Sequence, residues 1–436
     1  MNFGVNMYKK IIILYYYLKT KYFSKFHKGN LRDWQDKKIQ KFLKKILPKS
    51  KHYSEKYKNL SIKAWKDFPT IDKKEMMENF DDLNAVNISK DKAFEIAYKA
   101  EKERNFTPKI NEITVGLSSG TSGNRGIFLV SDLERYKWAG AVLAKILPNS
   151  IFCKNKVAFF LRANSNLYES VKSSTIEFCY FDMLNELDIN LKKLNEFKPT
   201  IIIAPPSMLK LIAKNYDKLS IIPKKFIAVA EVLEDVDKSF MEKIFGQTIH
   251  QVYQATEGFI AATCKYGHLH INEDILCIQK EYLDKKLGKF IPIITDFNRT
   301  SQPVIRYRLN DVLTESDEPC PCGSKFLRIE KIEGRCDDIF YLKSKNSQKV
   351  IPVFPDFLSR AVICASSEIQ DYKIIQKTQK EIEIYIDRKE EFEKLKKSLI
   401  QLFEKMNVEI PSINQLYSIK TDKLKKFKRI ESVING

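Results

Sequence analysis

Short hydrophobic runs separated by polar stretches dominate the chain from residue 115 to about residue 255. The runs are rich in β-branched and aromatic residues, and the polar stretches between them are long enough to form crossover helices. Because consecutive positions within a run are apolar, we expect strands buried on both faces, as in a parallel sheet covered by helices. The expected strands are KVAFFLRA (156–163), IEFCYFDM (176–183), TIIIAPP (200–206), KFIAVAEV (225–232) and TIHQVYQ (248–254).

The hydrophobic pattern differs on either side of this region. The first hundred residues show helical spacing, and the segment 31–47 places six apolar residues on one face: Leu31, Trp34, Ile39, Phe42, Leu43 and Ile46. After Gly267 the pattern favours strands instead, in HLHINEDILCIQ (268–279), KFIPIITDF (289–297) and PVIRYRLNDVL (303–313). We therefore expect a helical N-terminal region and a β-rich subdomain around the predicted parallel sheet.

The last hundred residues combine strand patterns with one charged helix. DYKIIQKTQKEIEIYIDR (371–388) and NQLYSIK (414–420) favour strands, and the segment from Glu390 to Met406 favours a helix. The predicted fold is α/β, with parallel sheets flanked by helices and a small, mobile C-terminal α+β domain. The predicted domains are a helical region at 1–110, a core at 111–335 and the C-terminal domain at 336–436.

Composition indicates a globular protein with a basic surface. The 436 residues are 44% hydrophobic, and 75 Lys and Arg against 55 Asp and Glu give a formal charge of +20. This charge favours anionic partners such as nucleotides or CoA, although scattered lysines also suit an ordinary solvated surface. We find no nucleic-acid-binding module and expect no nucleic-acid partner. The eight cysteines are irregularly spaced, which favours thiols or a metal site over a disulfide framework.

The N-terminus contains an apolar run of eight residues, Ile11 to Leu18. A membrane-spanning helix needs about 20 such residues, so this run does not span a bilayer. A signal peptide is disfavoured because Lys19 and Lys21 follow the run without a small-residue cleavage site. A helix packed on the body of the protein is favoured over a basic helix on a membrane surface. We therefore expect a cytoplasmic protein, and membrane association through this helix is the less favoured alternative.

A loop of small residues is the first candidate for chemistry. In VGLSSGTSGNRGIFLVS (115–131), three of the chain's 14 glycines fall within seven positions, among Ser and Thr hydroxyls and beside Arg125. Exposed backbone N–H groups, hydroxyls and a cation together suit a polyphosphate. A Gly- and Ser-rich hairpin turn has a similar sequence, so the loop alone leaves both alternatives open.

Four further motifs follow in order: YQATEG (253–258), RYRLND (306–311), GRCDD (334–338) and KKFKRI (425–430). Together with the loop they resemble the adenylate-forming superfamily of acyl-CoA synthetases and adenylation domains. The segments FPTIDKKEMMENFDDLN (68–84), APPSML (204–209), AEVLED (230–235) and PCPCG (319–323) resemble the branch of phenylacetate-CoA ligase, coenzyme F synthetase and CapK-type capsular polysaccharide proteins. The resemblance extends from about Trp34 to the C-terminus.

The resemblance implies a nucleotide site. The ATP phosphates would be bound by the loop residues Ser118, Ser119, Gly120, Thr121, Ser122, Gly123 and Arg125, the last standing where the family usually has Lys. Tyr253 would stack on adenine, Thr256 would contact phosphate, and Glu257 would hold Mg²⁺. Asp311 would bind the ribose hydroxyls. A strand end with a turn is the alternative for YQATEG, and a surface turn is the alternative for Asp311.

The last motifs imply a moving C-terminal domain. Arg335 would approach the nucleotide, and Asp337 would be the hinge between the adenylation and transfer arrangements. Lys426 would bridge the substrate carboxylate and the α-phosphate. Lys425 occupies the family's glycine position and Lys428 lies close by, so a merely basic tail is the alternative. The segment YLKSKNSQKVIPVF (341–354) lacks the usual glycine-containing turn, which puts CoA as the acceptor in doubt.

The cysteines supply a separate candidate site. Cys264, His270, Cys320 and Cys322 resemble the zinc site of some phenylacetate-CoA ligase relatives, and a C-x-C pair with a nearby His suits a structural tetrahedral zinc. Buried thiols without a metal are the alternative. His268 is a rival ligand because alternation along a strand puts it on the same face as His270. Cys277 and Cys336 are weaker rivals.

The predicted activity is ATP-dependent activation of a carboxylate as acyl-AMP with release of pyrophosphate. Transfer to a thiol, either CoA or an acyl carrier protein, would follow. The alternatives are a nucleotidyl transferase acting on a hydroxyl, a CapK-type role in capsular polysaccharide synthesis, and a non-catalytic nucleotide-binding protein. We expect the substrate pocket between about Leu161 and Val232, with Phe178, Tyr180 and Ala230 as candidate lining residues, although strand aromatics of this kind also form cores.

Overall fold

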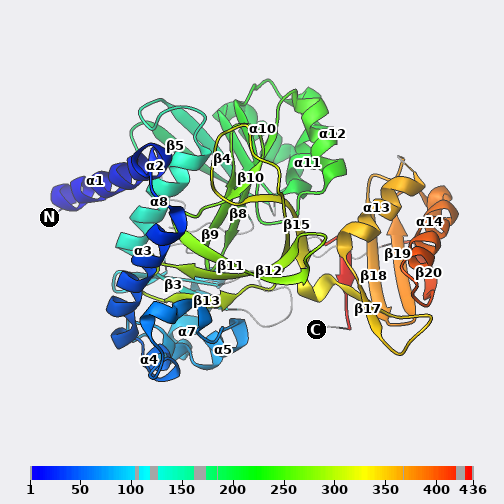
Figure 1. Ribbon diagram of the computed structural model, residues 1–436. Helices are drawn as coiled ribbons and strands as arrows, with labels where there is room; N and C mark the ends of the chain where they lie inside the picture. Colours follow the sequence, from blue (N-terminus) through cyan, green and yellow to red (C-terminus); the bar gives the residue numbers. More distant parts are fainter. Residues whose placement is uncertain are drawn as a thin grey trace.

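The computed structural model describes residues 2–103, 108–117, 126–161, 173–183, 185–366, 368–418 and 428–434. Figure 1 shows a body built around a large sheet, with an N-terminal helix extending from one side and a small α+β unit on the opposite side. The predicted α/β class, with a large sheet flanked by helices, is confirmed. The domain boundaries at residues 110 and 335 stay predictions.

Helices form most of the N-terminal region, as the sequence predicts. Asn30 and Asp72 cap two of them by accepting hydrogen bonds from backbone N–H groups of the first helical turn. Four of the six apolar positions predicted on one face of 31–47 are buried, namely Ile39, Phe42, Leu43 and Ile46, whereas Leu31 and Trp34 are partly exposed. The α-helices are α1 (Asn2–Lys21), α2 (Phe23–Phe26), α3 (Leu31–Ile46), α4 (Lys51–Lys56), α5 (Lys73–Glu78), α6 (Phe80–Leu83) and α7 (Lys90–Lys102), and η1 (Leu47–Lys49) and η2 (Ile62–Asp67) are 3₁₀ turns.

A small antiparallel sheet follows the helical region and frames the small-residue loop. Its strands are β1 (Lys109–Ile110), β2 (Ile113–Leu117) and β3 (Ile127–Ser131), and β2 pairs with β3 from Ile113↔Ser131 to Leu117↔Ile127. The loop predicted to bind phosphate, residues 118–125, joins these two strands and lies outside the described residues.

Among the described residues, twelve strands form one mixed sheet. The strands predicted between residues 156 and 254 are all present, and they are parallel to one another in the order β8-β7-β6-β4-β5. Their bounds are β4 (Asn155–Leu161), β5 (Ile176–Asp182), β6 (Ile201–Ala204), β7 (Lys225–Ala228) and β8 (Ile249–Ala255). β6 and β7 are buried at every position, which confirms the expectation of strands covered on both faces.

The sheet becomes antiparallel beyond β8, where the β-rich subdomain was predicted. Two predicted strands are each interrupted: 268–279 is divided between β10 and β11, and 303–313 between β13 and β14. Both segments contain strands, as predicted, but the backbone turns between β10 and β11, where Ile275 N and Leu276 N both donate to Asn272 O. The strands are β9 (Gly258–Thr263), β10 (Leu269–Ile271), β11 (Leu276–Asp284), β12 (Lys289–Asp296), β13 (Val304–Arg308), β14 (Asp311–Glu315) and β15 (Arg328–Arg335).

Helices cover the parallel half of the sheet. α8 begins with a capping box in which Ser131 and Glu134 satisfy each other's backbone N–H groups, and α12 ends at Gly246, whose φ of +66° suits glycine. Two apolar cores result, one under α1 and α8 and one under the helices after β5. The covering helices are α8 (Asp132–Ile146), α10 (Leu187–Phe197), α11 (Pro206–Lys214) and α12 (Asp235–Phe245), with the 3₁₀ turn η3 (Tyr216–Lys218).

The C-terminal part is a separate α+β unit with its own apolar core. Its sheet has the strand order β20-β19-β18-β21, and a hairpin of β16 and β17 precedes it. The predicted charged helix is present as α14 (Phe392–Lys405). The other elements are η4 (Cys336–Asp338), β16 (Phe340–Lys343), β17 (Val350–Val353), α13 (Pro355–Ala365), β18 (Tyr372–Thr378), β19 (Glu381–Ile386), η5 (Lys389–Glu391), β20 (Ser412–Leu416) and β21 (Ile430–Ser432).

Candidate active site

The point where the sheet changes from parallel to antiparallel also brings the predicted nucleotide residues together. β8 pairs in parallel with β7 and antiparallel with β9, and the turn between β8 and β9 carries Thr256 and Glu257. Tyr253 lies three residues earlier, near the end of β8. Side chains at such a change of strand direction project beyond the carboxyl end of the parallel strands, which is where α/β sheets bind ligands.

Tyr253 and Asp311 are joined directly, although 58 residues separate them in sequence. The Tyr253 hydroxyl donates a hydrogen bond to Asp311 Oδ2. Burial raises the pKa of Tyr253 well above its usual value, and the Asp311 charge raises it further. Asp311 begins β14 and is paired in register with Arg335 at the end of β15. The structure therefore places the proposed adenine, ribose and nucleotide-facing residues beside one another.

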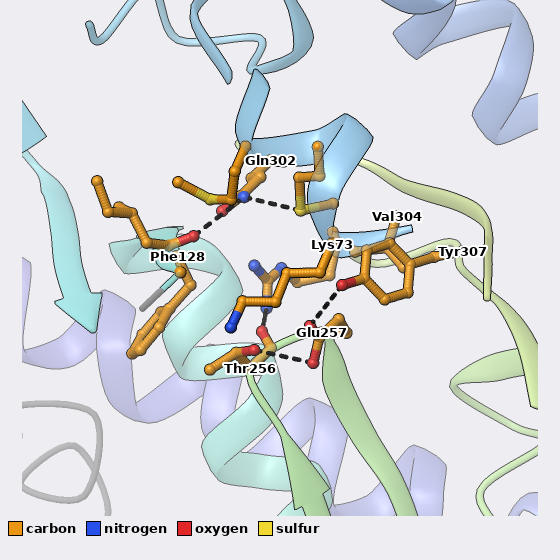
Figure 2. Close-up of a pocket in the computed structure, with 12 residues that line it drawn as sticks. Lys73, Phe128, Thr256, Glu257, Gln302, Val304 and Tyr307 are labelled. Carbon is orange, nitrogen blue, oxygen red and sulfur yellow. Dashed lines mark hydrogen bonds between the residues drawn. The ribbon is translucent and has the colours of Figure 1, made fainter. Parts of the chain in front are cut away.

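Glu257 has a hydrogen-bond donor on each carboxylate oxygen. Thr256 Oγ1 donates to Glu257 Oε2 at 2.8 Å, and the Tyr307 hydroxyl donates to Oε1 at 3.0 Å. Figure 2 shows the Lys73 amine reaching toward Thr256 and Glu257. Burial lowers the pKa of Lys73, an effect that Glu257 opposes and Arg335 reinforces. Asp72 caps α5 through the Glu75 backbone and thereby fixes the first turn, where Lys73 lies.

A pocket with about 320 Å³ of empty space, partly open to solvent, adjoins Thr256 and Glu257. It begins directly after the small-residue loop, because Gly126, Ile127 and Phe128 line one side. The remaining lining residues come from three distant segments: Lys73, Met76, Met77, Thr256, Glu257, Arg299, Gln302, Val304 and Tyr307. Oxygen donors such as Glu257 and the Thr256 hydroxyl fit a hard cation, so these residues could hold Mg²⁺.

A buried carboxylate supports the floor of this pocket. Glu134 accepts hydrogen bonds from Thr300 N, Ser301 N and the hydroxyls of Ser131 and Ser301. Burial alone would raise its pKa, but the Arg299 charge and these donors lower it. Arg299 in turn donates to the Thr256 backbone oxygen at 3.0 Å. The turn that carries Thr256 is thus connected to α8 through Arg299 and Glu134.

The segment proposed as a hinge contacts both the core and the chain's end. Asn310 Nδ2 donates to Asp337 Oδ2 at 2.6 Å, and Lys428 Nζ lies 2.7 Å from Asp338 Oδ1. Gly334, just before this segment, has a φ of +124°, which other residues rarely adopt. Lys426, the predicted catalytic lysine, lies outside the described residues, as do Ser118 to Gly123 and Arg125.

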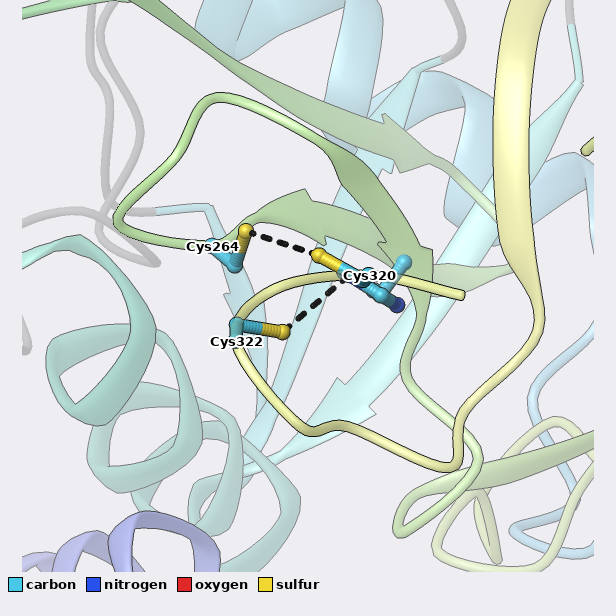
Figure 3. Close-up of side chains that lie close together, drawn as sticks. Cys264, Cys320 and Cys322 are labelled. Atoms are coloured by element: carbon cyan, nitrogen blue, oxygen red, sulfur yellow. Dashed lines mark hydrogen bonds between the residues drawn. The ribbon is translucent and has the colours of Figure 1, made fainter. Parts of the chain in front are cut away.

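Cys264, His270, Cys320 and Cys322 form a compact cluster whose ligand atoms all lie within 4.8 Å of one another. Figure 3 shows the three sulfur atoms converging from two separate loops. Cys264 Sγ and Cys320 Sγ are 3.7 Å apart, and Cys322 Sγ is 3.5 Å from His270 Nε2. With Zn–S near 2.3 Å and Zn–N near 2.0–2.1 Å, a tetrahedral zinc would separate such pairs by about 3.8 Å and about 3.5 Å. The cluster therefore fits zinc.

The second nitrogen of His270 is also placed as in a metal site. His270 Nδ1 lies 3.2 Å from the Phe326 carbonyl oxygen, so Nδ1–H donates and Nε2 is left to face the sulfur atoms. His268 is also near, with Nδ1 3.1 Å from Cys320 Sγ. The weaker rivals do not join the cluster: Cys277 is buried in an apolar core, and Cys336 lies in η4.

Sequence reasoning missed several residues of the pocket. Lys73 lies in the FPTIDKKEMM segment and Tyr307 in RYRLND, both singled out by resemblance, but neither had an assigned role. Lys73 and Tyr307 are far from Glu257 in sequence, so their position beside this proposed metal ligand can be recognised only in the structure. Phe178, proposed for the substrate pocket, is buried in a core, and the Tyr180 hydroxyl donates to the Leu161 oxygen. Ala230 has a φ of +68°, and none of these three lines the described pocket.

Comparison with known proteins agrees with the family resemblance of the motifs. No family model matches the chain. It is similar to Protein CapK of Staphylococcus aureus, with 25% identity over 384 residues, covering 82% of this chain and 78% of that protein. It is also similar to phenylacetate-coenzyme A ligase of Thermus thermophilus, with 22% identity over 220 residues, covering 46% of this chain and 47% of that protein.

The fold is shared with a solved acyl-CoA ligase. 2-Hydroxyisobutyryl-CoA ligase, in the postadenylation state in complex with 2-HIB-AMP, matches with a TM-score of 0.66 and 15% identity, over 91% of this chain and 88% of that one. Both the sequence relatives and this structural match agree with the family resemblance of the motifs. The chain therefore has the fold of this ligase, and its sequence is similar to two proteins of the branch that the motifs resemble.

Proposed function

We propose that this protein is an ATP-dependent, AMP-forming ligase that activates a carboxylate as acyl-AMP and transfers the acyl group to a thiol. One observation carries the proposal: Tyr253, Glu257, Asp311 and Arg335 come from distant segments and converge at one edge of the sheet, beside a pocket. The similarity to phenylacetate-coenzyme A ligase supports the same reaction class.

In the first step a carboxylate oxygen would attack the α-phosphorus of ATP, and pyrophosphate would leave. Tyr253 and Asp311 would position the adenosine, and the loop 118–125 would bind the phosphates. Bound at Glu257 and Thr256, Mg²⁺ would offset charge on the phosphate oxygens. Lys73 adds a positive charge that faces Glu257, and Lys426 would offset charge that grows in the transition state.

In the second step a thiolate would attack the acyl carbonyl and form a thioester, and AMP would leave with the bonding electrons of the broken acyl–phosphate anhydride bond. The C-terminal unit would change position between the two steps by rotating at Asp337, which lies in the turn η4 before this unit. CoA is one candidate acceptor, and an acyl carrier protein is the other. We also propose a structural zinc at Cys264, His270, Cys320 and Cys322, and a cytoplasmic location.

The test is isotope exchange between pyrophosphate and ATP over a panel of carboxylates, with and without CoA. The expected result is exchange that depends on one carboxylate class and on Mg²⁺, followed by acyl-CoA formation when CoA is added. Exchange driven by a phenolic hydroxyl, with no response to any carboxylate, would contradict the proposal and favour nucleotidyl transfer.

The similarity to Protein CapK over most of the chain favours a second candidate, a role in capsular polysaccharide synthesis as in the CapK-type branch. An adenylating activity fits this role if the activated group is passed to a saccharide. The same exchange assay, with hydroxyl and amino sugars as acceptors of the acyl group, distinguishes it from CoA transfer.

A further inference from the structure

The N-terminal helix α1 has two different faces. Ile13 and Tyr17 are buried in the apolar core formed with α8, and Tyr17 also accepts a hydrogen bond from the Ile151 backbone N–H. Gly140 of α8 allows this close packing, because a Cβ there would lie 2.4 Å from the Ile13 carbonyl oxygen. α1 is therefore attached to the body through one face.

The opposite face of α1 is apolar and exposed. Met7, Tyr8, Ile11, Tyr15 and Leu18 are 57%, 56%, 59%, 60% and 39% exposed, respectively. At 100° per residue these positions fall within one arc of about 100°, directly opposite Ile13 and Tyr17. We call these five side chains the α1 stripe. The stripe extends along the helix from Met7 to Leu18.

Lysines flank the α1 stripe on both sides. At the same helical period, Lys19 lies beside one edge of the stripe, and Lys10 and Lys21 lie between the other edge and the buried face, where Lys21 Nζ donates to the Tyr17 hydroxyl at 2.8 Å. Residues 1–32 contain seven Lys and Arg side chains and no Asp or Glu. An apolar helical face rich in tyrosine, leucine and isoleucine with lysines at its edges is the composition of helices that lie in a membrane interface.

Among the described residues, none of the helices combines the length and hydrophobicity required to cross a bilayer. The placement of α1 suits attachment to a surface instead. Figure 1 shows α1 extending from the side of the body opposite the C-terminal unit, so its outer face is not blocked by the C-terminal sheet or its helices.

We propose that the α1 stripe binds the surface of a membrane that contains anionic lipids. The stripe would enter the headgroup region, and Lys10, Lys19 and Lys21 would contact lipid phosphates. A second copy of the chain is disfavoured as the occupant because two α1 helices would bring like charges together without any acidic residue to pair them. The sequence favours a helix packed on the body of the protein over one on a membrane surface. The proposal differs because the eight-residue apolar run does not indicate which side chains of the helix are exposed.

The test is co-flotation of the full-length protein with vesicles of phosphatidylcholine alone or with about one third phosphatidylglycerol. We expect binding to the anionic vesicles, weakened at high salt. Ile11→Ser/Tyr15→Ser should lower the partition coefficient at least tenfold. Lys10→Gln/Lys21→Gln should lower it by about 30-fold, because each lysine near an anionic surface contributes about a factor of five.

Matched controls exist elsewhere on the surface. Ile222→Ser/Tyr417→Ser removes the same residue types at positions that are 90% and 69% exposed, and Lys285→Gln/Lys286→Gln removes two exposed lysines. Both controls should bind vesicles like the unmodified protein, and thermal unfolding should show that all four variants are folded.

Three outcomes would overturn the proposal: failure of the unmodified protein to bind anionic vesicles, equal binding by Ile11→Ser/Tyr15→Ser, or equal loss in the controls. Sedimentation analysis provides a further check. A dimer that Ile11→Ser/Tyr15→Ser converts to a monomer would assign the α1 stripe to a second copy. None of these measurements depends on the catalytic activity. Membrane binding by the α1 stripe is therefore tested independently of the proposed ligase function.

Discussion

Glu257 is held by one hydroxyl on each oxygen, from Thr256 and Tyr307, so its carboxylate is fixed in one orientation at the pocket. We expect Glu257→Gln to lower pyrophosphate–ATP exchange by about 100-fold, because the substitution removes the charge proposed to hold Mg²⁺ but keeps the shape. Tyr307→Phe, which keeps that charge, should lower exchange by less than about tenfold. Unchanged exchange in Glu257→Gln, in a variant that unfolds at the same temperature, would remove the proposed role.

The contact that Lys428 makes with Asp338 allows its role to be tested separately from that of Lys426. Lys428 lies 2.7 Å from the buried carboxyl of Asp338. Burial raises the pKa of Asp338, and the charge of Lys428 lowers it. We expect Lys426→Ala to suppress exchange by at least 100-fold. Lys428→Ala should instead reduce stability by about 1–3 kcal/mol, by leaving Asp338 unpaired, with a smaller loss of exchange. A larger loss of exchange in Lys428→Ala would transfer the catalytic role to Lys428.

His250 predicts part of the pH dependence of stability. Burial, with Lys225 and Lys238 nearby, lowers its pKa to about 3, against about 6.5 in an unfolded chain. Below pH 6.5 the unfolded chain therefore binds a proton that the folded protein does not. This contribution to stability is complete above pH 6.5 and is lost as the pH falls, by up to about 1.4 kcal/mol per pH unit.

The measurement is urea unfolding of the unmodified protein and His250→Gln at pH 7.5 and 5.0. The variant keeps a polar partner for Thr263, whose hydroxyl lies 3.0 Å from His250 Nδ1. The stability difference between the two proteins should shrink by about 2 kcal/mol at pH 5.0. Identical pH dependence in both proteins would show that His250 titrates normally.

At the scale of elements, two loops meet at the cysteine cluster. One follows β9 and leads into β10, and the other precedes β15, so a metal there would join both ends of the antiparallel subdomain. We expect about one zinc per chain in protein purified without added metal. Cys320→Ser and His270→Gln should lose it, whereas His268→Gln should retain it because its contact is limited to Cys320. If His270→Gln retained zinc and His268→Gln lost it, His268 rather than His270 would be the zinc ligand.

The exposed Cys153 provides the control for these zinc measurements. Cys153→Ser should keep the full zinc content. A chain with less than about one tenth of an equivalent of zinc, and with the three cluster thiols accessible to thiol reagents in the folded state, would contradict a structural site.

The strands that the sequence predicts best are those buried on both faces. β6 and β7 consist almost wholly of apolar residues, so their pattern is independent of their neighbours. The breaks between β10 and β11 and between β13 and β14 were not predicted, because they depend on which backbone groups are hydrogen-bond partners, as in the turn where Ile275 N and Leu276 N donate to Asn272 O. Hydrophobic pattern alone carries no information about such partners.

The candidate site also contains residues that the sequence predicts and residues that it does not. Tyr253, Thr256, Glu257, Asp311 and Arg335 were named in advance because each lies in a short motif, and the structure brings them together. Lys73 and Tyr307 were not assigned a role, because their approach depends on a pairing between Ile71 and Tyr307 across more than 200 residues. The roles of all these residues stay predictions until the exchange assay is done.

At the scale of the whole molecule, an ionic network joins the core to the C-terminal unit. Asp237 of α12 accepts two hydrogen bonds from Arg429, at 2.9 and 2.7 Å, and lies 2.9 Å from Lys210 of α11. Lys210 also lies 2.8 Å from Asp371, beside β18. Three of the four side chains are nearly inaccessible to water, so this network, rather than the exposed surface pairs, should hold the arrangement of the two parts.

We expect Asp237→Asn to loosen this arrangement, because it leaves Lys210 and Arg429 without their shared carboxylate. Limited trypsin digestion between the core and the C-terminal unit should become at least tenfold faster, corresponding to about 1.4 kcal/mol. Asp188→Asn is the matched control, since Asp188 pairs with Lys218 at the exposed surface. Equal digestion rates for Asp237→Asn and the unmodified protein would show that other contacts hold the unit in place.

The long insertion between β10 and β15 has a consequence for synthesis on the ribosome. β10 needs β15 as its second neighbour, and Cys264 needs Cys320, which follows 56 residues later. At about 5–20 residues per second, a growing chain waits about 3–11 s between these two cysteines. During that interval Cys264 and the open edge of β10 belong to an unfinished subdomain. The second edge of β10 therefore stays unpaired until β15, which follows PCPCG in the sequence, has left the exit tunnel.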